Sequence, residues 1–294
     1  MSEPRAVAFG VLKGGFGKTT TSLNTARELA RRNGRALVVD LDDNGHMTLN
    51  LGFDAAYRGE AWADSDETIN HAGEVLLDGQ NPEQYIVNVV DGLDLFPAHV
   101  DYESVQNALK DATMGTTRLA KNLVEPLLGE TYDHIVIDCP ANRGKLNDNA
   151  MYATNNIIIP LRPENGYESG LTNTLQRLVK EAREYFDLNI LAIVPTDLQE
   201  RVDHQTRDRA LLEEMTKREH VAQHVPNFAY LSEDDWAAID AGEYDGSLPG
   251  IRHRRSIDAA HSAGLPLRDY DPDCDQLAHY AELAEIVERG EVAR

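Results

Sequence analysis

The chain carries a glycine- and lysine-rich segment at residues 13–20, Lys-Gly-Gly-Phe-Gly-Lys-Thr-Thr, whose residue types suit phosphate binding. Glycine permits backbone conformations and close approaches that a side chain would block. The N–H groups of such a loop converge on phosphate oxygens at the positive N-terminus of a helix. Lys18 can bring a mobile positive charge to the outer phosphates, and the Thr19 hydroxyl suits a Mg²⁺ ligand. We expect the nucleotide to contact Gly14, Gly15, Phe16, Gly17, Lys18, Thr19 and Thr20.

The segment departs from the usual phosphate-loop pattern, G-x-x-x-x-G-K-[ST], at its opening position. Counting back from Gly17, that position holds Leu12 in place of glycine, and a second lysine, Lys13, follows it. The segment is therefore a deviant version, K-G-G-x-G-K-T. The alternative is a glycine-rich turn between a strand and a helix that binds nothing.

Acidic residues that could complete a nucleotide site follow two later apolar runs. Asp40 and Asp42 come at the end of one run, and in a strand their side chains point to the same face. A carboxylate there can position water against the outer phosphate or hold the shell of a metal ion. Asp138 ends another run, as is usual for a carboxylate that accepts a Mg²⁺-bound water. We expect Thr19, Asp40, Asp42 and Asp138 to surround the metal; the alternative for each aspartate alone is a helix cap or a turn.

These residues need elements that bring them together, and apolar runs alternate with helical stretches along the chain. The predicted strands are 6–12, 35–41, 134–138, 156–161 and 189–195. The predicted helices include 19–33, 116–128, 167–185 and 204–218. This alternation predicts an α/β fold, a single doubly wound domain over residues 1–294 with a mostly parallel central sheet flanked by helices. Ligands in such folds bind at the carboxyl ends of the strands.

Three other stretches stand out from this pattern. Residues 53–68 are polar and residues 231–250 are acidic and loop-like, so both are expected to be exposed excursions. Residues 274–289 carry apolar side chains at helical spacing, which predicts a C-terminal helix docked on the core.

The composition is strongly acidic, with 50 Asp and Glu against 28 Lys and Arg and a formal net charge of -22. The even spread favours a halophilic cytoplasm, where a dense acidic surface keeps proteins soluble; an ordinary acidic protein is the alternative. Any DNA contact then needs a local basic patch. The two cysteines, Cys139 and Cys274, suit a reducing compartment. We expect a cytoplasmic protein, since no apolar run could span a bilayer and no signal-peptide core begins the chain.

The chain resembles the ParA/Soj family of deviant-Walker ATPases, which are relatives of MinD. The loop at 13–20 matches the family signature, Asp40-Leu41-Asp42 matches its switch I, and residues 137–140 match the end of its Walker B segment. Further blocks that resemble the family lie at 93–98, 160–164 and 251–272, so the resemblance covers roughly residues 5–288.

The resemblance implies ATP and ADP with Mg²⁺ as ligands, and a role for each matched residue. Lys13 would reach phosphate across an ATP-sandwiched homodimer, and Lys18 would bind the β and γ phosphates. Asp42 would orient the attacking water, while Asp138 would hold the metal through water with support from Asp40. The adenine pocket of the family corresponds to Pro195, Thr196 and Asp197. One departure concerns switch I, where the family has Pro-Gln-Gly-Asn and this chain has Asp-Asn-Gly-His at 43–46.

The resemblance also implies non-specific DNA binding, a nucleoid-associated location and a ParB-like partner that stimulates hydrolysis. The candidate DNA contacts lie in the block that resembles the DNA-contacting region of the family: Arg252, Arg254, Arg255 and Arg268. The alternative is a solvated turn whose arginines balance nearby acid.

Two other functions use the same scaffold. A MinD-like protein cycles on membranes, but here the C-terminal residues 285–291 are too acidic for an anionic membrane. A metabolic ATP-dependent enzyme, such as a dethiobiotin-synthetase-like ligase, would not need a basic cluster. An electron donor resembling nitrogenase reductase is disfavoured, because neither cysteine lies between switch I and Walker B to bind a cluster.

Overall fold

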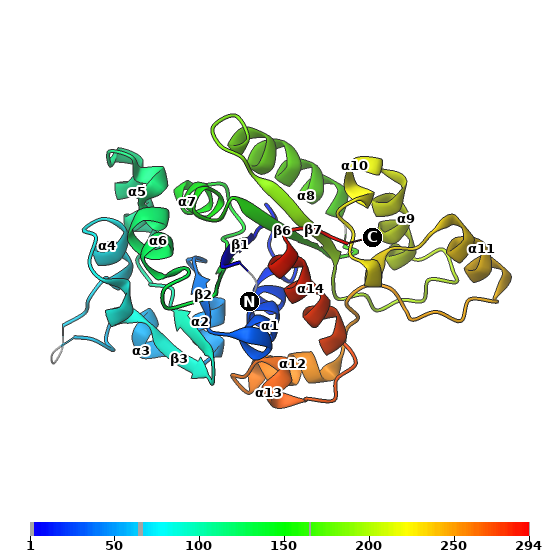
Figure 1. The fold of residues 1–294 in the computed structure, drawn as a ribbon, viewed down its shortest axis with the longest axis horizontal. Helices are drawn as coiled ribbons and strands as arrows, with labels where there is room; N and C mark the ends of the chain where they lie inside the picture. The colour runs from blue at the N-terminus through cyan, green and yellow to red at the C-terminus, as the bar shows by residue number, and fades with distance from the viewer. Residues whose placement is uncertain (1–2, 64–66, 165, 294) are drawn as a thin grey trace.

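The computed structural model describes residues 3–63, 67–164 and 166–293. Within them, seven strands form one sheet in the order β3-β4-β2-β5-β1-β6-β7, and only the edge pair β3–β4 is antiparallel. The strands are β1 Arg5–Phe9, β2 Ala36–Asp40, β3 Val87–Val90, β4 Leu93–Phe96, β5 His134–Asp138, β6 Asn156–Leu161 and β7 Asn189–Pro195. The predicted α/β fold with a mostly parallel sheet is confirmed (Figure 1).

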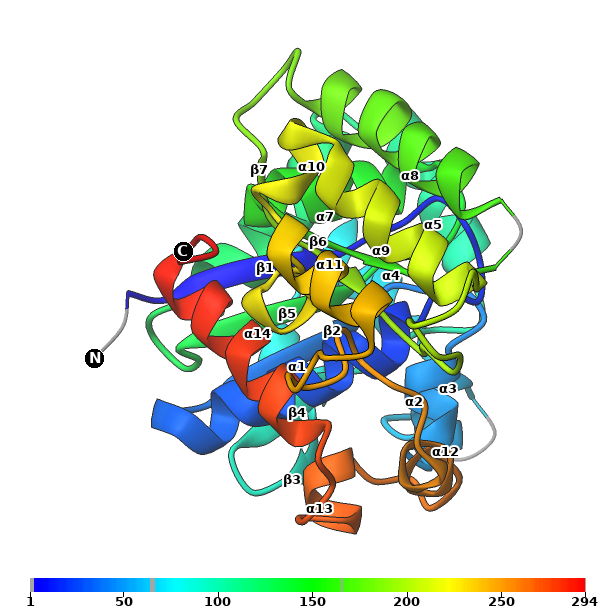
Figure 2. The same ribbon diagram turned by 90° about the vertical axis from the view of Figure 1, so that its right-hand side faces the viewer.

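Helices cover both faces of this sheet, and short helices fill the connections (Figures 1 and 2). The α-helices are α1 Lys18–Asn33, α2 His46–Asn50, α3 Asp54–Tyr57, α4 His71–Leu76, α5 Tyr102–Asp111, α6 Glu125–Leu127, α7 Lys145–Thr154, α8 Tyr167–Thr174, α9 Arg207–Lys217, α10 Glu219–Ala222, α11 Glu233–Ala241, α12 Arg255–Ser262, α13 Leu267–Tyr270 and α14 Leu277–Arg289. Short 3₁₀ turns occur at Pro82–Tyr85, Gly115–Thr117 and Asn227–Ala229, and π-helical stretches at Ala120–Val124 and Leu175–Lys180.

The central strands are apolar on both faces because each face meets a helix layer. In β1, Val7 and Phe9 pack in the core beneath α1 and α14, whereas Ala6 and Ala8 pack in the core on the opposite face. Alternate strand residues point to opposite sides, so a strand between two helix layers reads as a continuous apolar run. This is why the sequence pattern revealed five of the strands. It missed β3, whose residues are only partly buried or exposed, and β4, whose short buried run is interrupted by Asp94.

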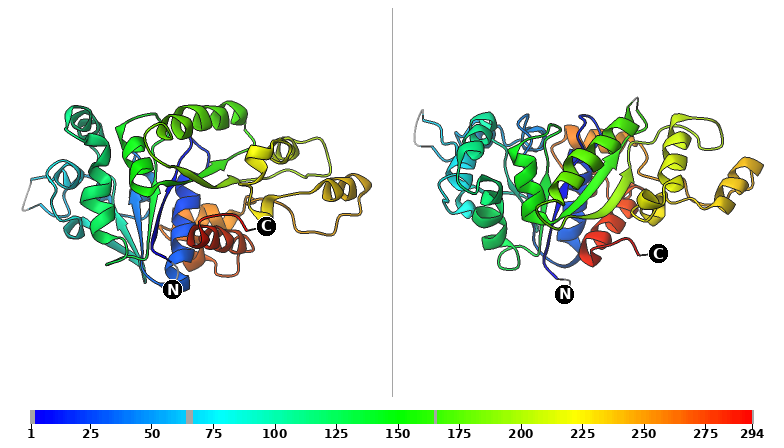
Figure 3. Two further views of the ribbon diagram at one scale, coloured as in Figure 1. Left: turned by 45° about the horizontal axis from the view of Figure 1, so that its top comes forward. Right: turned by 90° about the horizontal axis from the view of Figure 1, so that it is seen from above.

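Both of the expected excursions contain a short helix. Within 53–63, α3 forms and Ala56 is buried, while Trp62 packs its ring 4.9 Å from that of His71; residues 64–66 of the predicted excursion lie outside the described residues. Within 231–250, α11 forms because Ser232 and Asp235 make a reciprocal capping box at its N-terminus. Figure 3 shows α11 projecting from the β7 side of the molecule.

The C-terminal helix α14 lies along α1, and its apolar face is buried. Tyr280, Leu283, Ile286 and Val287 have almost no exposed surface. On its other side Arg32 of α1 pairs with Glu285 and Glu288 of α14. Among the described residues, no helix combines the length and apolar character required to cross a membrane.

A buried aromatic cluster supports the sheet next to β4. His71 of α4 lies among Trp62, Tyr85, Phe96 and His99. Its Nε2–H donates to the carbonyl oxygen of Pro97 at 2.9 Å. Burial disfavours the charged ring and lowers the pKa of His71 to about 4.

We expect acid to destabilise the fold through His71. The unfolded chain takes up a proton near pH 6.5, whereas the folded chain resists it until about pH 4, so stability falls as pH drops through this window. The full loss is on the order of 3 kcal/mol. Urea unfolding at a series of pH values measures it. The variant His71→Gln, which retains an N–H donor, should flatten the slope, whereas replacing the exposed His220 with Gln should not. Equal slopes for His71→Gln and the unmodified protein would contradict the assignment.

Candidate nucleotide-binding site

The strand order brings the predicted chemical residues to one edge of the sheet. Strand β5 lies between β2 and β1, and its last residue, Asp138, is in register with Asp40 on one side and Phe9 on the other. The glycine-rich loop follows β1 directly and leads into α1. Because these strands are parallel, their carboxyl ends meet, and the loop faces both aspartates.

The loop has the backbone geometry that its glycines permit. Gly15 and Gly17 have φ angles of 78° and 75°, in the left-handed region that disfavours other residues. A Cβ atom on Gly17 would lie 3.0 Å from the hydroxyl of Thr196. No side chain caps the N-terminus of α1, so its first N–H groups can bind an anion. Lys18 opens this helix and is only 6% exposed.

Asp138 and Thr19 fit a magnesium site. The Thr19 hydroxyl donates to Asp138 Oδ2 at 2.7 Å, while the buried Oδ1 has no hydrogen-bond partner among the described residues. Burial, with a contribution from Asp40, raises the pKa of Asp138 to about 8, although Lys18 and Thr19 act in the opposite direction. A divalent cation would favour the ionised form and, through bound water, supply the missing partner of Oδ1.

A metal held in this way needs no cage of protein carboxylates. No group of three or more His, Cys, Asp or Glu within the described residues is arranged to hold a metal ion. Mg²⁺ at phosphate sites keeps several waters and takes phosphate oxygens with only one or two protein ligands. The residues that would hold it are the Thr19 hydroxyl and, through water, Asp138. Bound there, the metal would neutralise charge on the phosphates.

Asp40 is engaged in a different way from the predicted metal contact. Its Oδ2 accepts hydrogen bonds from the backbone N–H and the hydroxyl of Thr48, at 3.0 and 2.7 Å, and its Oδ1 accepts from the Asp42 N–H at 3.2 Å. Burial raises the pKa of Asp40 to about 6 despite these bonds. The carboxylate thus ties the end of β2 to α2, which favours a structural role in switch I over direct metal binding.

Asp42 lies one step further along switch I and is 8% exposed. Its Oδ1 accepts from the backbone N–H of Asn44 at 3.0 Å and from the Asn44 side-chain amide at 2.9 Å. Its charge adds to the rise in the pKa of Asp138, so the two carboxylates lie close together. That Asp42 orients the attacking water stays a prediction.

A cavity of about 240 Å³ adjoins the phosphate loop, and we call it the base pocket because the residues predicted to contact adenine include two that line it. Thr196 and Asp197 line it from the end of β7, and Ile251 and His253 line it from the C-terminal block. The predicted Pro195 does not line this cavity; it is a buried strand residue whose carbonyl oxygen accepts from the Ile251 N–H at 3.0 Å. Sequence reasoning did not assign His253 to this pocket, although it adjoins residues that were noted.

Lys13 extends along the outer side of the loop. Its ammonium lies 5.0 Å from the ring centroid of Phe16. Gly166 and Gly170, at the start of α8, leave room for it, since a Cβ on Gly166 would come within 2.9 Å of the Lys13 Nζ. Lys13 therefore packs within its own subunit in this structure.

The four predicted DNA-binding arginines do not form one free cluster. Arg252 is 6% exposed and donates to the carbonyl oxygen of Glu200 at 2.7 Å, so little of its side chain is available to DNA. Arg254 pairs with Asp275, and Arg268 with the buried Glu28, at 2.6 and 2.8 Å. Arg255 is exposed at the start of α12 and makes no ion pair with the described residues. DNA binding by these arginines stays a prediction.

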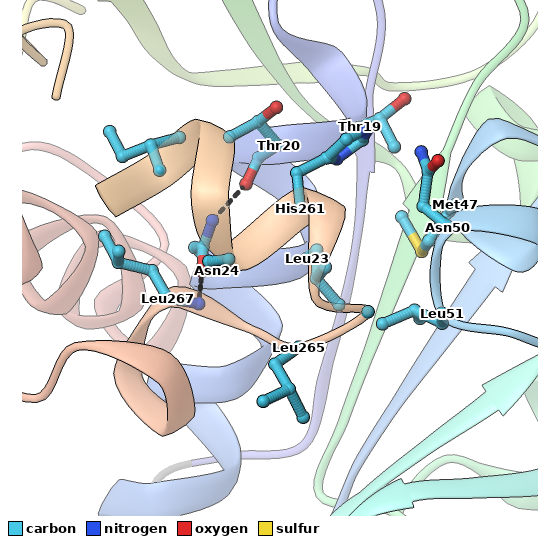
Figure 4. Close-up of a pocket in the computed structure, with 13 residues that line it drawn as sticks. Thr19, Thr20, Leu23, Asn24, Met47, Asn50, Leu51, His261, Leu265 and Leu267 are labelled. Atoms are coloured by element: carbon cyan, nitrogen blue, oxygen red, sulfur yellow. Dashed lines mark hydrogen bonds between the residues drawn. The ribbon is translucent and has the colours of Figure 1, made fainter. Parts of the chain in front are cut away.

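The helix that carries Arg255 also borders the nucleotide site. Figure 4 shows Thr19 and Thr20 of α1 beside His261 of α12 and Met47 of α2, around a small cavity of about 20 Å³. Asn24 donates to the Thr20 carbonyl oxygen within α1 and accepts from the Leu267 N–H, both at 2.8 Å, so it ties α1 to the start of α13.

Comparison with known proteins agrees with this geometry. The family model for an AAA domain matches residues 4–190. The chromosome-partitioning ATPase Soj of Thermus thermophilus is 34% identical over 197 residues, which cover 66% of this chain and 70% of the relative. The chain belongs to the ParA/Soj family of P-loop ATPases. It is thus an ATPase, with ATP as substrate, ADP as product and Mg²⁺ as the metal.

Solved structures share the fold of this ParA/Soj family member at lower identity. A Borrelia burgdorferi plasmid partition protein bound to AMPPNP aligns with a TM-score of 0.70 and 20% identity, covering 98% of this chain and 100% of its own. Cobyrinic acid a,c-diamide synthase of Mycobacterium smegmatis, with ADP and magnesium, aligns with a TM-score of 0.68 and 24% identity, covering 97% and 93%.

We expect Lys18→Ala to weaken Mg-ATP binding roughly a hundredfold, because each charged hydrogen bond to phosphate contributes about 1.5–3 kcal/mol. Isothermal titration calorimetry measures this. Lys110→Ala is the matched control, since Lys110 is an exposed lysine on α5 that donates to Asn107. Tight ATP binding by Lys18→Ala would exclude the assigned role.

Proposed function

We propose that this chain is a ParA-like partition or positioning ATPase that forms an ATP-sandwiched homodimer, binds DNA non-specifically and responds to a ParB-like activator. The observation that carries the proposal is the second lysine of the loop. Lys13 contacts Phe16 at an edge where Gly14 and Gly15 are exposed, rather than lining the base pocket. We propose that a lysine at this edge leaves its contact with Phe16 and reaches the phosphates of a second subunit when the dimer forms.

Such an arrangement couples hydrolysis to dimerisation. Lys18 supplies charge from its own subunit, whereas Lys13 supplies it only after a second subunit arrives. A cation delivered in trans stabilises the charge of phosphoryl transfer, as arginine fingers do in other P-loop enzymes. The monomer then keeps ATP intact until it pairs.

Asp42→Ala provides the first test of this cycle. Without a carboxylate to orient water, we expect hydrolysis about a hundredfold slower, unchanged ATP affinity and accumulation of the ATP-bound dimer. Phosphate release and size-exclusion chromatography with light scattering measure these effects. Asp54→Ala, which removes an exposed carboxylate on α3, is the control. Normal turnover by Asp42→Ala would show that another group positions the water.

DNA binding is proposed to depend on the dimer. The protein carries a formal charge of -22, and most of the predicted arginine cluster is paired with carboxylates. A single subunit therefore offers few free cations near α12, chiefly Arg255. Joining two subunits places two such sites on one DNA, which raises the overall affinity without new contacts. This form would be nucleoid-associated.

We expect Arg255→Glu to weaken DNA retention by the ATP-bound protein. If each subunit neutralises one phosphate through Arg255, the slope of log affinity against log salt should fall by about 2 per dimer. Fluorescence anisotropy with duplexes of unrelated sequence measures both quantities. Lys121→Glu makes the same charge change at an exposed lysine beside α6 and should have little effect. If both variants lost DNA affinity equally, the cause would be the change in net charge and not the loss of a contact between α12 and DNA.

A metabolic ATP-dependent enzyme is the second candidate, because the fold is shared with cobyrinic acid a,c-diamide synthase. Such an enzyme has no need for ATP-dependent DNA binding, so the anisotropy experiment separates the two functions. A MinD-like membrane cycle is less well supported, since the apolar face of α14 is already buried on the core.

A further inference from the structure

A residue outside the predicted site joins the phosphate loop to the base pocket. Arg162 follows β6, and its Nη1 donates to the carbonyl oxygen of Gly15 at 2.8 Å. Its Nη2 forms an ion pair with Asp197, which lines the base pocket, and lies 3.5 Å from Glu164. We infer that Arg162 is a positioning residue, which aims the amides of the phosphate loop at the phosphates and is itself held by Asp197.

The peptide geometry supplies the reason. In a trans peptide the C=O and the following N–H point in opposite directions. Arg162, which itself lines the base pocket, holds the Gly15 carbonyl oxygen toward its guanidinium, so the N–H of Phe16 points away from Arg162. The Thr196 hydroxyl lies 3.4 Å from the Phe16 carbonyl oxygen and 3.3 Å from the Leu161 carbonyl oxygen, so its one proton is not committed to the loop. The contact with Arg162 thereby sets the Phe16 amide for phosphate before the nucleotide arrives.

Asp197 is well placed to hold the guanidinium. It has a φ angle of 55°, unusual for a residue other than glycine. Besides pairing with Arg162, it accepts from His253 Nδ1 at 2.9 Å and from Gln199 Nε2 at 3.3 Å. These contacts fix the carboxylate from several directions. The segment that borders the base therefore controls the orientation of the loop that binds phosphate.

An arginine suits this position better than a lysine. Its planar fork serves two acceptors at once, here the Gly15 carbonyl oxygen and the Asp197 carboxylate, whereas a lysine is a single point of charge. Donors that are oriented in advance spare the ligand the cost of ordering the loop. Arg162 thus acts through the loop backbone and need not touch phosphate itself.

The decisive probe is a ligand with phosphates but no base. We compare Mg-ATP with Mg-tripolyphosphate by isothermal titration calorimetry, using the full chain and the variants Arg162→Gln and Asp197→Asn. Both variants should weaken both ligands, by about tenfold, the loss that one charge-assisted hydrogen bond supplies. The Asp197 variant should affect tripolyphosphate even though Asp197 borders the base pocket. The double variant should bind no more weakly than Arg162→Gln alone, since the two residues act as a unit.

Control variants distinguish the positioning role of Arg162 from a general effect of lost positive charge and from a loss of folding stability. Arg207 lines the cavity next to Arg162 and Asp197, so Arg207→Gln removes an equal nearby charge and should leave tripolyphosphate binding unchanged. Arg162→Lys should recover only part of the affinity. Melting temperatures without nucleotide report folding; if Arg162→Gln unfolds, the tripolyphosphate affinity of Asp197→Asn decides alone.

Two results would overturn the inference. Asp197→Asn could weaken ATP while leaving tripolyphosphate unaffected, which would make Asp197 a base contact only. Alternatively, the losses of the two single variants could add in the double variant, which would show that they act separately. The inference rests on ATP binding and not on the proposed partition function, so failure of one leaves the other standing.

Discussion

Two buried carboxylates on paired strand positions, Asp40 and Asp138, set the conditions for the whole site. Both are fully buried, and burial raises the pKa of each; the charge of Asp42 adds to the rise at Asp40, and the charge of Asp40 adds to the rise at Asp138. Unpaired negative charges of this kind are costly in a protein interior. The fold satisfies Asp40 internally, through Thr48 and the backbone of switch I. Among the residues that the structure describes, Asp138 has only the Thr19 hydroxyl as a hydrogen-bond donor and the nearby charge of Lys18, so its remaining oxygen suits a cation with its waters.

The same carboxylates connect the nucleotide site to the rest of the fold. Asp40 holds the first turn of α2, and the Thr48 hydroxyl in turn accepts from the Ala98 N–H at 2.8 Å. Tyr102 of α5 donates to the Asp40 carbonyl oxygen at 3.0 Å. Switch I is therefore bonded to the segment after β4, next to the cluster around His71. A change at switch I has a continuous path of hydrogen bonds into this half of the sheet.

Charge pairing governs the surface in a similar way. The chain has far more acid than base, and ion pairs tie arginines to carboxylates across elements, as in Arg27 with Asp269 or Arg254 with Asp275. Exposed pairs contribute little stability individually, but each one neutralises a cation that could otherwise bind an anion. Arginines that are close together in this sequence therefore do not form a basic patch on the surface of the folded chain. The unpaired positions, such as Arg255, carry more information about partners than the local density of arginine.

The residues predicted to bind phosphate and metal can be selected from the sequence, because the roles predicted for them depend on local backbone geometry. The glycines of the loop, Lys18 and Thr19 lie between a strand and a helix, and Asp138 ends an apolar run, so short-range spacing is sufficient. Continuous apolar runs likewise identify strands buried on both faces. The segment at α11 escaped prediction because its apolar residues are not gathered on one face of the helix, although Ser232 and Asp235 form a cap that the sequence contains.

By itself, then, the sequence determined a deviant phosphate loop with its acidic partners and an α/β sheet to carry them. Only the tertiary structure decided which charged side chains are available. Arg252 proved buried, Asp40 proved bonded to Thr48, and Arg162 proved to contact both Gly15 and Asp197. These partners lie far apart along the chain. The spacing of residues in the sequence therefore does not predict that they are in contact. The residue type sets the charge of a side chain, but whether that charge can bind a ligand depends on the residues that contact it in the folded chain.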